Sequence, residues 1–172
     1  MAIRVKICGM TNQDDALWAA AHGADALGFI FYSKSPRFIE VDAAREIVSV
    51  LPPFVTPVGV FVNEPRDRVE ATAREVGLRA VQLHGDESPE ACGGFSLPVI
   101  KALRVGETFD ASTLEAYPVD TFLLDTDKKG LYGGTGETFD WSIAREAKQC
   151  GRIVLSGGLD PDNVAEAVRQ VR

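Results

Sequence analysis

Two side chains of this sequence have the types and positions needed for acid–base chemistry. Cys8 ends the strand-like segment that starts at Ile3, and Asp125 ends the apolar run that starts at Phe122. A thiolate can act as a base, and burial among apolar neighbours disfavours the charged form of a carboxyl group, which would keep Asp125 protonated as an acid. Taken singly, such a cysteine is more often buried packing, and such an aspartate is as often a cap. Together, one base and one acid suffice for an aldose-to-ketose isomerisation.

Lys6 lies two residues before Cys8, so the two side chains point to the same side of a strand. An ammonium group without a partner would be costly inside a barrel. Two roles therefore stay open, and they do not exclude each other. Lys6 could stabilise a thiolate, or it could pair with an interior carboxylate.

Two glycine-rich stretches follow predicted strands. Gly157 and Gly158 expose backbone N–H groups before a helix predicted to start with Asp160 as its cap and Pro161 at its first position. This arrangement suits a phosphate group, which N–H groups and a helix dipole bind. The second stretch, residues 128–136, lacks the context of a nucleotide-binding loop, and we interpret it as a loop that covers the site. A plain surface linker is the alternative.

Two further residues are candidates for substrate binding. Arg37 lies in the segment 33–39 and offers a guanidinium fork to a substrate carboxylate, although most loop arginines are only solvated. His84 either binds substrate or caps its own loop. With the two glycines, they complete the predicted substrate-binding set of Arg37, His84, Gly157 and Gly158.

The elements that must position these residues are short apolar runs that alternate with amphipathic stretches. The runs are typical of buried parallel strands. They cover residues 3–8, 26–31, 57–62, 80–84, 99–103, 121–125 and 153–156. Helix start signals follow at Asn12, Asp42 and Asn63, and stop signals at Gly23, Gly77 and Gly151. The spacing between strand ends allows one helix each time, so seven βα units are visible.

Strict alternation leaves two architectures, a doubly wound open sheet or a closed eight-stranded barrel. An open sheet concentrates its site at one switch point, whereas polar residues here end most strands, which favours the α/β class with a TIM (β/α)8 barrel. These strand-end residues are Cys8, Asn63, His84, Arg104, Asp125 and Ser156. Barrels normally run to at least about 200 residues. We therefore expect residues 1–172 to be a single barrel domain that is incomplete at its C-terminal end. The eighth strand and helix are either missing or lie in a segment beyond these residues.

Composition excludes several function classes. The chain has 172 residues and a net charge of −7, which argues against nucleic-acid or anionic-membrane partners. Its three cysteines form no CxxC and no zinc-ligand spacing, so we expect neither disulfides nor a metal site. The chain opens directly into a strand-like segment and has no membrane-length apolar run, so we predict a cytoplasmic protein. Both a monomer and a homodimer remain open.

Six motifs in register resemble those of the phosphoribosylanthranilate isomerase family of tryptophan biosynthesis. They lie at Lys6–Gly9, Gly28–Arg37, Val60–Asn63, Val81–Glu87, Leu124–Gly136 and Leu155–Val164. The resemblance implies that Cys8 is the general base and Asp125 the general acid of a cofactor-free Amadori rearrangement of N-(5′-phosphoribosyl)anthranilate. It further implies that the substrate carboxylate lies near Arg37 and the phosphate on the loops after strands seven and eight.

Two competing interpretations remain. Another phosphate-binding barrel, such as a histidine-pathway isomerase or a ribulose-phosphate epimerase, is opposed by Cys8, because those enzymes resemble carboxylate-based or metal-dependent sites at this strand. The other is an inactive or complementing barrel fragment that binds a phosphate ligand without turnover. The expected absence of an eighth unit supports it.

Overall fold

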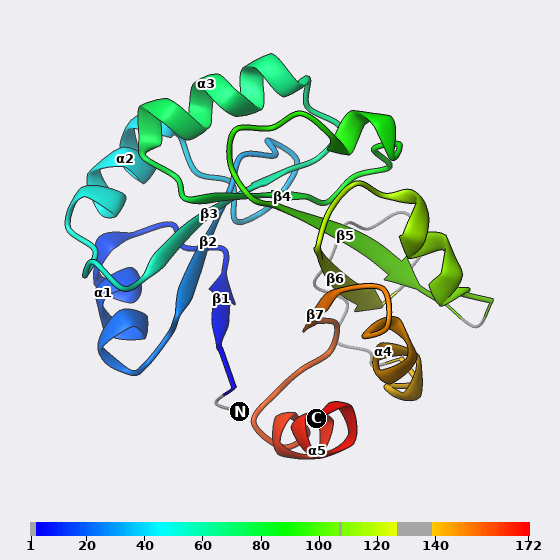
Figure 1. Cartoon of the computed structure of the whole chain (residues 1–172). Helices are drawn as coiled ribbons and strands as arrows, with labels where there is room; N and C mark the ends of the chain where they lie inside the picture. The colour runs from blue at the N-terminus through cyan, green and yellow to red at the C-terminus, as the bar shows by residue number, and fades with distance from the viewer. Residues whose placement is uncertain (1–2, 107, 127–138) are drawn as a thin grey trace. The chain divides into compact units, whose positions relative to one another are not determined.

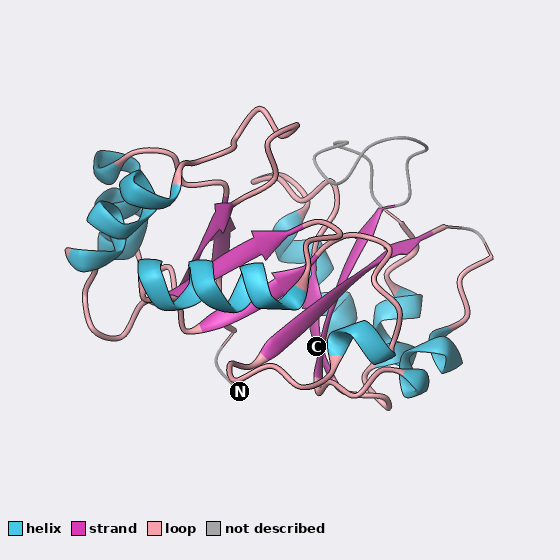
Figure 2. Ribbon diagram, turned by 90° about the horizontal axis from the view of Figure 1, so that it is seen from above, coloured by secondary structure: helices cyan, strands magenta, loops and turns pink. Residues whose placement is uncertain are grey.

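The computed structural model describes residues 3–106, 108–126 and 139–172, in which parallel strands alternate with helices (Figures 1 and 2). These residues form two compact units. The first unit comprises residues up to 86 together with 94–99, and the second comprises 87–93 and 100–172. The glycine-rich stretch 128–136 lies outside the described residues, so its interpretation as a covering loop stays a prediction.

Four parallel strands build the first unit. They are β1 (Lys6–Cys8), β2 (Ala26–Ile30), β3 (Thr56–Phe61) and β4 (Ala80–Leu83), paired in this order. Helices α1 (Gln13–Ala21), α2 (Val41–Ser49) and α3 (Arg66–Val76) lie along one side of these strands (Figure 1). The carboxyl ends of the four strands therefore share one edge, as parallel pairing requires.

The helices of the first unit begin and end in part at the residues predicted from the sequence. Asn12 caps α1, since its Oδ1 accepts from the backbone N–H of Asp15 at 2.8 Å, and Gly77 ends α3 with a left-handed φ of 81°. The helix predicted after Asn63 is observed as α3, although Pro65 and not Asn63 is its N-cap, and the start predicted at Asp42 is wrong. The N-cap of α2 is Glu40, and Asn63 instead accepts from the backbone N–H of Asp86 at 2.7 Å. A side-chain oxygen can serve a neighbouring loop as well as a helix, and the sequence does not distinguish the two.

Small and branched apolar residues fill the space between the helices and strands of this unit. Ala16 on α1 and Ala44 on α2 are fully buried, and so are Leu27 and Phe29 on β2. Alanine lets a helix backbone approach a sheet closely, while the alternate residues Leu27 and Phe29 point to one face of β2.

The second unit has three parallel strands and a core of its own. The strands are β5 (Val99–Val105), which belongs to this unit from Ile100 on, β6 (Thr121–Thr126) and β7 (Arg152–Leu155). The 3₁₀ helices η1 (Glu90–Cys92) and η2 (Ala111–Ala116) and the α-helices α4 (Ser142–Ala147) and α5 (Val164–Val171) complete it. Leu114 on η2, Phe122 and Leu124 on β6, and Ala144 on α4 are fully buried in one cluster. Since Phe122 and Leu124 face this core, Leu123 and Asp125 point to the other side of β6.

A buried ion pair lies in the second unit. Lys101 on β5 donates to the Glu87 carboxylate at 2.6 Å, and the two side chains are only 2% and 6% exposed. Burial raises the pKa of the neighbouring Cys92 thiol. The charge of Lys101 lowers this pKa and that of Glu87 raises it, both by less than burial does. The sequence gives no signal for this pair, because the partners come from different elements.

Replacing Lys101 with methionine is expected to destabilise the protein by about 3–5 kcal/mol, because the carboxylate of Glu87 is then left buried without this cation. Urea unfolding followed by circular dichroism measures the change. Arg45→Met is the matched control, since its ion pair with Asp42 is half exposed or more, and should cost about 1 kcal/mol or less. A Lys101→Met variant as stable as Arg45→Met would contradict the prediction.

Candidate active site

The end of β1 carries Cys8 as a half-buried free thiol. The backbone turns away immediately afterwards, where the N–H groups of Gly9 and Met10 both donate to the carbonyl of Gly28, at 2.9 and 3.0 Å. Gly9 has a φ of 92°, which favours glycine. The thiol therefore lies at the carboxyl edge of the strands, where parallel α/β folds place reactive groups.

Arg37 lies beside Cys8. Its Nη1 donates to the carbonyl oxygen of Cys8 at 2.7 Å, and a Cβ at Gly9 would lie only 2.6 Å from Arg37 Cδ. Arg37 itself is exposed. The structure thus brings together two predicted site residues, and Arg37 would have to shift if Gly9 carried a side chain.

His84 follows β4 at the same edge of the first unit. Its Nδ1 lies 2.6 Å from Nε2 of Gln82, and its backbone N–H donates to the carbonyl of Phe61 at 2.8 Å. His84 is half buried, and its ring is held by Gln82 of the preceding strand. Gln82 was not predicted as part of the site, although its position two residues before His84 places both side chains on one face.

Asp125 lies near the end of β6 in the second unit and is 4% exposed. Its Oδ1 accepts from the backbone N–H of Thr126 at 2.9 Å. The register partner of Asp125 on β5 is Arg104, so these two strand-end residues lie side by side on neighbouring strands. The carboxylate is therefore fixed at the carboxyl edge of the second unit's strands, in surroundings that exclude most solvent.

Gly157 and Gly158 follow β7, and Gly157 lies next to Asp125. Both have left-handed φ values, 83° and 60°, and a Cβ on Gly157 would lie 3.0 Å from Asp125 Oδ1 and 2.6 Å from the backbone nitrogen of Thr126. No side chain fits at Gly157. The sequence predicted the phosphate-type turn but did not predict that it would pack directly against the acid.

The helix after this turn starts later than predicted. α5 begins at Val164, with Asn163 at the N-cap, rather than at Pro161. Asp160 instead accepts from the backbone N–H groups of Asp162 and Asn163, at 2.8 and 2.9 Å. The predicted capping chemistry of Asp160 is present, but it closes a turn that precedes the helix.

Replacing Gly157 with alanine is expected to lower kcat at least about tenfold, because the methyl group can be accommodated only if Thr126 and Asp125 move. Steady-state turnover measures the loss. Gly23→Ala is the matched control, since Gly23 also has a left-handed φ, of 92°, but nothing lies within 4 Å of its Cβ position. The Gly23→Ala substitution should lower the free energy of unfolding by about 1–2 kcal/mol and leave kcat unchanged. Equal kcat in the two variants would show that the close packing is irrelevant to activity.

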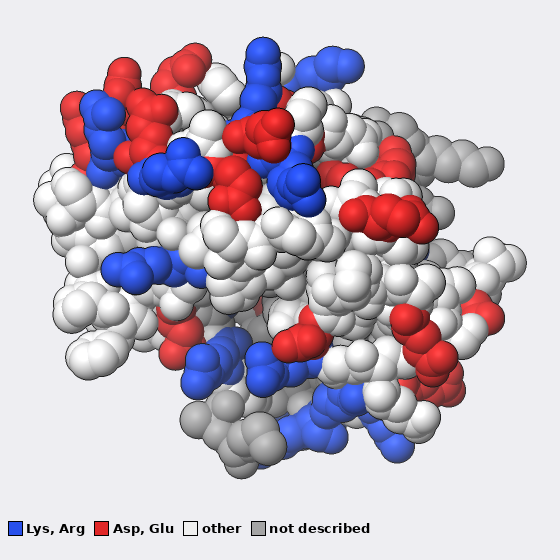
Figure 3. Space-filling model, turned by 45° about the horizontal axis from the view of Figure 1, so that its top comes forward, with Lys and Arg blue, Asp and Glu red and all other residues white. Residues whose placement is uncertain are grey.

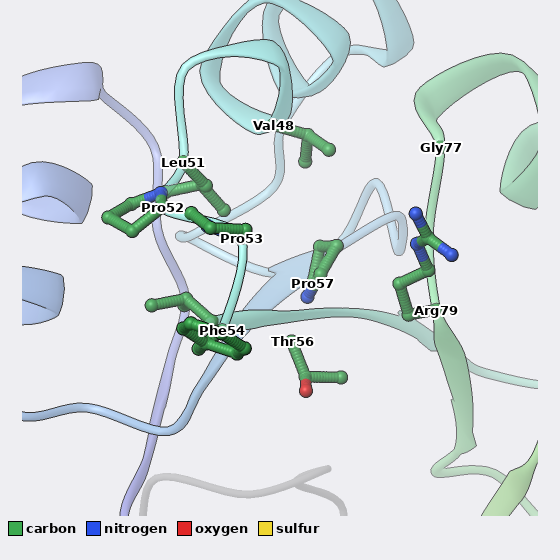
Figure 4. A pocket seen from close by; sticks show the side chains of 10 residues that line it. Val48, Leu51, Pro52, Pro53, Phe54, Thr56, Pro57, Gly77 and Arg79 are labelled. Atoms are coloured by element: carbon green, nitrogen blue, oxygen red, sulfur yellow. The ribbon is translucent and has the colours of Figure 1, made fainter.

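A surface cavity of about 470 Å³ lies at the other end of the first unit's strands (Figure 4). Pro53 and Phe54 line it together with Thr56, the first residue of β3, and Arg79, which precedes β4. Phe54 is 94% exposed. Because these positions mark the amino ends of β3 and β4, the cavity is separate from the residues at the carboxyl ends.

The described residues contain no group of three or more His, Cys, Asp or Glu side chains that could hold a metal ion. Basic and acidic side chains are interspersed on the face shown in Figure 3. No helix in the described part of the chain is long and apolar enough to cross a membrane.

Parallel strands that alternate with helices, and polar or reactive side chains at strand carboxyl ends, are typical of (β/α)-barrel enzymes. The family model described as N-(5′-phosphoribosyl)anthranilate (PRA) isomerase matches residues 5–172. The chain belongs to this family, and its function is that of a phosphoribosylanthranilate isomerase of tryptophan biosynthesis.

Known members of the family are similar to this chain in sequence and in structure. The N-(5′-phosphoribosyl)anthranilate isomerase of Citrifermentans bemidjiense is 54% identical over 168 residues, which cover 98% of this chain and 82% of the relative. The crystal structure of phosphoribosyl anthranilate isomerase from Thermotoga maritima superposes with a TM-score of 0.91 at 46% identity, covering 99% of this chain and 84% of that one. A further structure, with a TM-score of 0.87 at 44% identity and coverage of 99% and 84%, is phosphoribosyl anthranilate isomerase in complex with reduced 1-(o-carboxyphenylamino)-1-deoxyribulose 5-phosphate. These likenesses confirm the barrel class.

Proposed function

We propose that Cys8 is the general base and Asp125 the general acid of the Amadori rearrangement that converts N-(5′-phosphoribosyl)anthranilate to 1-(2-carboxyphenylamino)-1-deoxyribulose 5-phosphate. The observation that carries the proposal is the placement of Asp125. It is a carboxyl group that is 4% exposed, lies near a strand carboxyl end, and contacts the glycine turn suited to phosphate. Cys8 supports it as the reactive group at the corresponding end of β1.

The two residues divide the proton transfers. Asp125 gives its proton to the furanose ring oxygen, the bond from C1′ to that oxygen breaks, and the anilinic nitrogen supplies the electron pair of the resulting iminium ion. The Cys8 thiolate then removes the proton from C2′, and the C–H electron pair forms the C1′=C2′ bond while the iminium electrons return to nitrogen. The enol at C2′ tautomerises to the ketone as C1′ gains a proton. The iminium ion is the electron sink, so the chemistry requires no metal or cofactor.

The remaining predicted residues have complementary binding roles in this proposal. Arg37 binds the anthranilate carboxylate through guanidinium N–H groups that its bond to the Cys8 carbonyl leaves available. Gly157 and Gly158 bind the phosphate through backbone N–H groups. His84, held by Gln82, contacts the substrate at the same edge as Arg37. The complex of the related isomerase with a reduced product analogue supports a phosphorylated ligand of this kind.

The test is turnover of phosphoribosylanthranilate, followed as loss of its fluorescence, for wild-type, Cys8→Ala and Asp125→Asn proteins in buffer containing EDTA. The wild type should turn over and both variants should be impaired. Near-normal kcat in both variants would overturn the assignment of base and acid. A wild type that is active only without EDTA would overturn the metal-free mechanism.

We further propose that the protein works in the cytoplasm, which fits three cysteines that are all free thiols in the structure. Whether it is a monomer or a homodimer stays a prediction, and light scattering of the purified protein decides it. That residues 1–172 form one barrel domain also stays a prediction.

A further inference from the structure

The side chains of Lys6 and Cys8 both lie close to Gly28 on the neighbouring strand β2. A Cβ added to Gly28 would lie 2.8 Å from Cys8 Sγ and 3.0 Å from Lys6 Nζ. The sulfur and the ammonium nitrogen are therefore separated by no more than the sum of these two distances. Both residues are half buried, whereas Ile7 between them is 40% exposed on the other face of β1.

Gly28 makes this approach possible. It is the register partner of Cys8 on β2, and the register partner of Lys6 is Ala26. A glycine inside a strand weakens the strand and often marks a close approach of other groups. Here it leaves open the space that the thiol and the ammonium group share.

The other charged groups around β1 do not neutralise Lys6. No hydrogen bond or ion pair to its ammonium group occurs among the described residues, and β2 carries no titratable side chain. The carboxylate of Asp25 bonds to the backbone N–H of Val5, beyond the amino end of β1, and Asp15 in the first turn of α1 bonds to Asn12.

A second cation lies near Cys8. Arg37 donates to the Cys8 carbonyl oxygen at 2.7 Å. Of the two roles that the sequence leaves open for Lys6, the ion pair with a carboxylate is thus absent from the described residues. What the ammonium group faces instead is a thiol.

We infer that Lys6 is a positioning residue for the isomerase reaction, which holds the Cys8 side chain in its thiolate form through the nearby ammonium charge. This inference rests on the proposed role of Cys8 as the base. The thiolate is the reactive form of cysteine, and an adjacent lysine favours it.

The experiment measures the ionisation of Cys8 directly, without turnover. The alkylation of Cys8 by iodoacetamide is followed at pH 7 and at pH 10 by peptide mass spectrometry, which separates it from Cys92 and Cys150. Lys6→Met should lower the rate at pH 7 by about tenfold, and the two proteins should converge at pH 10, where any accessible thiol is ionised. Lys6→Arg keeps the charge and should stay near the wild-type rate. Lys148→Met removes an exposed lysine elsewhere and controls for net charge.

Two results would overturn the inference. One is an unchanged rate at pH 7 in Lys6→Met. The other is the same rate ratio at both pH values, because it would mean that Lys6 alters access to the sulfur and not its charge. If Lys6→Met does not fold, as judged by circular dichroism, Lys6→Gln replaces it in the same comparison. A failure of the proposed function is distinguishable, since Cys8→Ala would then retain turnover whatever the alkylation rates are.

Discussion

Replacing Cys8 with alanine is expected to lower kcat by about 10²–10⁴-fold, the range that a positioned acid–base group supplies. The thiolate is the group that removes the proton from C2′, and the variant leaves only water to do so. KM should change little, because Cys8 contributes its thiol to the proton transfer rather than to binding. The measurement is steady-state turnover followed by loss of substrate fluorescence.

A substrate deuterated at C2′ identifies the impaired step. In Cys8→Ala the removal of this proton becomes rate-limiting, so a primary isotope effect on kcat should appear or increase. Cys150→Ala is the control, since its half-buried sulfur donates to the carbonyl of Ala111, and its kcat should stay within about twofold of the wild type. A Cys8→Ala variant within tenfold of wild-type kcat, or without an isotope effect, would exclude Cys8 as the base.

The strands were predictable because their signal is local. Each of the seven predicted runs matches an observed strand within a few residues, and the largest difference is β1, which begins at Lys6 rather than Ile3. A short run of apolar residues bounded by turn residues is by itself enough to indicate a buried strand. Helix starts were less predictable, since Asp42, Asn63 and Asp160 all have cap-forming side chains. Which backbone N–H such an oxygen meets depends on tertiary neighbours.

The candidate site could be predicted residue by residue but not as a set of contacts. The types and strand-end positions of Cys8 and Asp125 are visible in the sequence. The close contacts around these two residues are not. Gly28 lies next to Cys8, and Gly157 lies next to Asp125. Each glycine leaves room for its neighbour, and only the folded structure shows which residues are neighbours. The Lys101–Glu87 pair is of the same kind, because 14 residues separate two groups that fold into hydrogen-bond distance.

Replacing Asp125 with asparagine is also expected to lower kcat by about 10²–10⁴-fold, because the amide has no proton of suitable acidity to give to the ring oxygen. The amide keeps the shape of the carboxyl group, and its oxygen can still accept from the backbone N–H of Thr126, a bond of 2.9 Å in the wild type. Folding should therefore be preserved. Asp120→Asn is the matched control, since this exposed residue precedes the same strand and its backbone carbonyl accepts from Arg152.

Chemical trapping separates the two variants, because they block successive steps. Cyanoborohydride reduces the iminium ion that forms when the ring opens. In Cys8→Ala this ion still forms but cannot lose its C2′ proton, so the reduced adduct should accumulate above the level seen without enzyme. In Asp125→Asn the ring stays closed, and trapping should not exceed that level. Accumulation in Asp125→Asn but not in Cys8→Ala would reverse the assignment, since ring opening would then depend on Cys8 and the later proton transfer on Asp125.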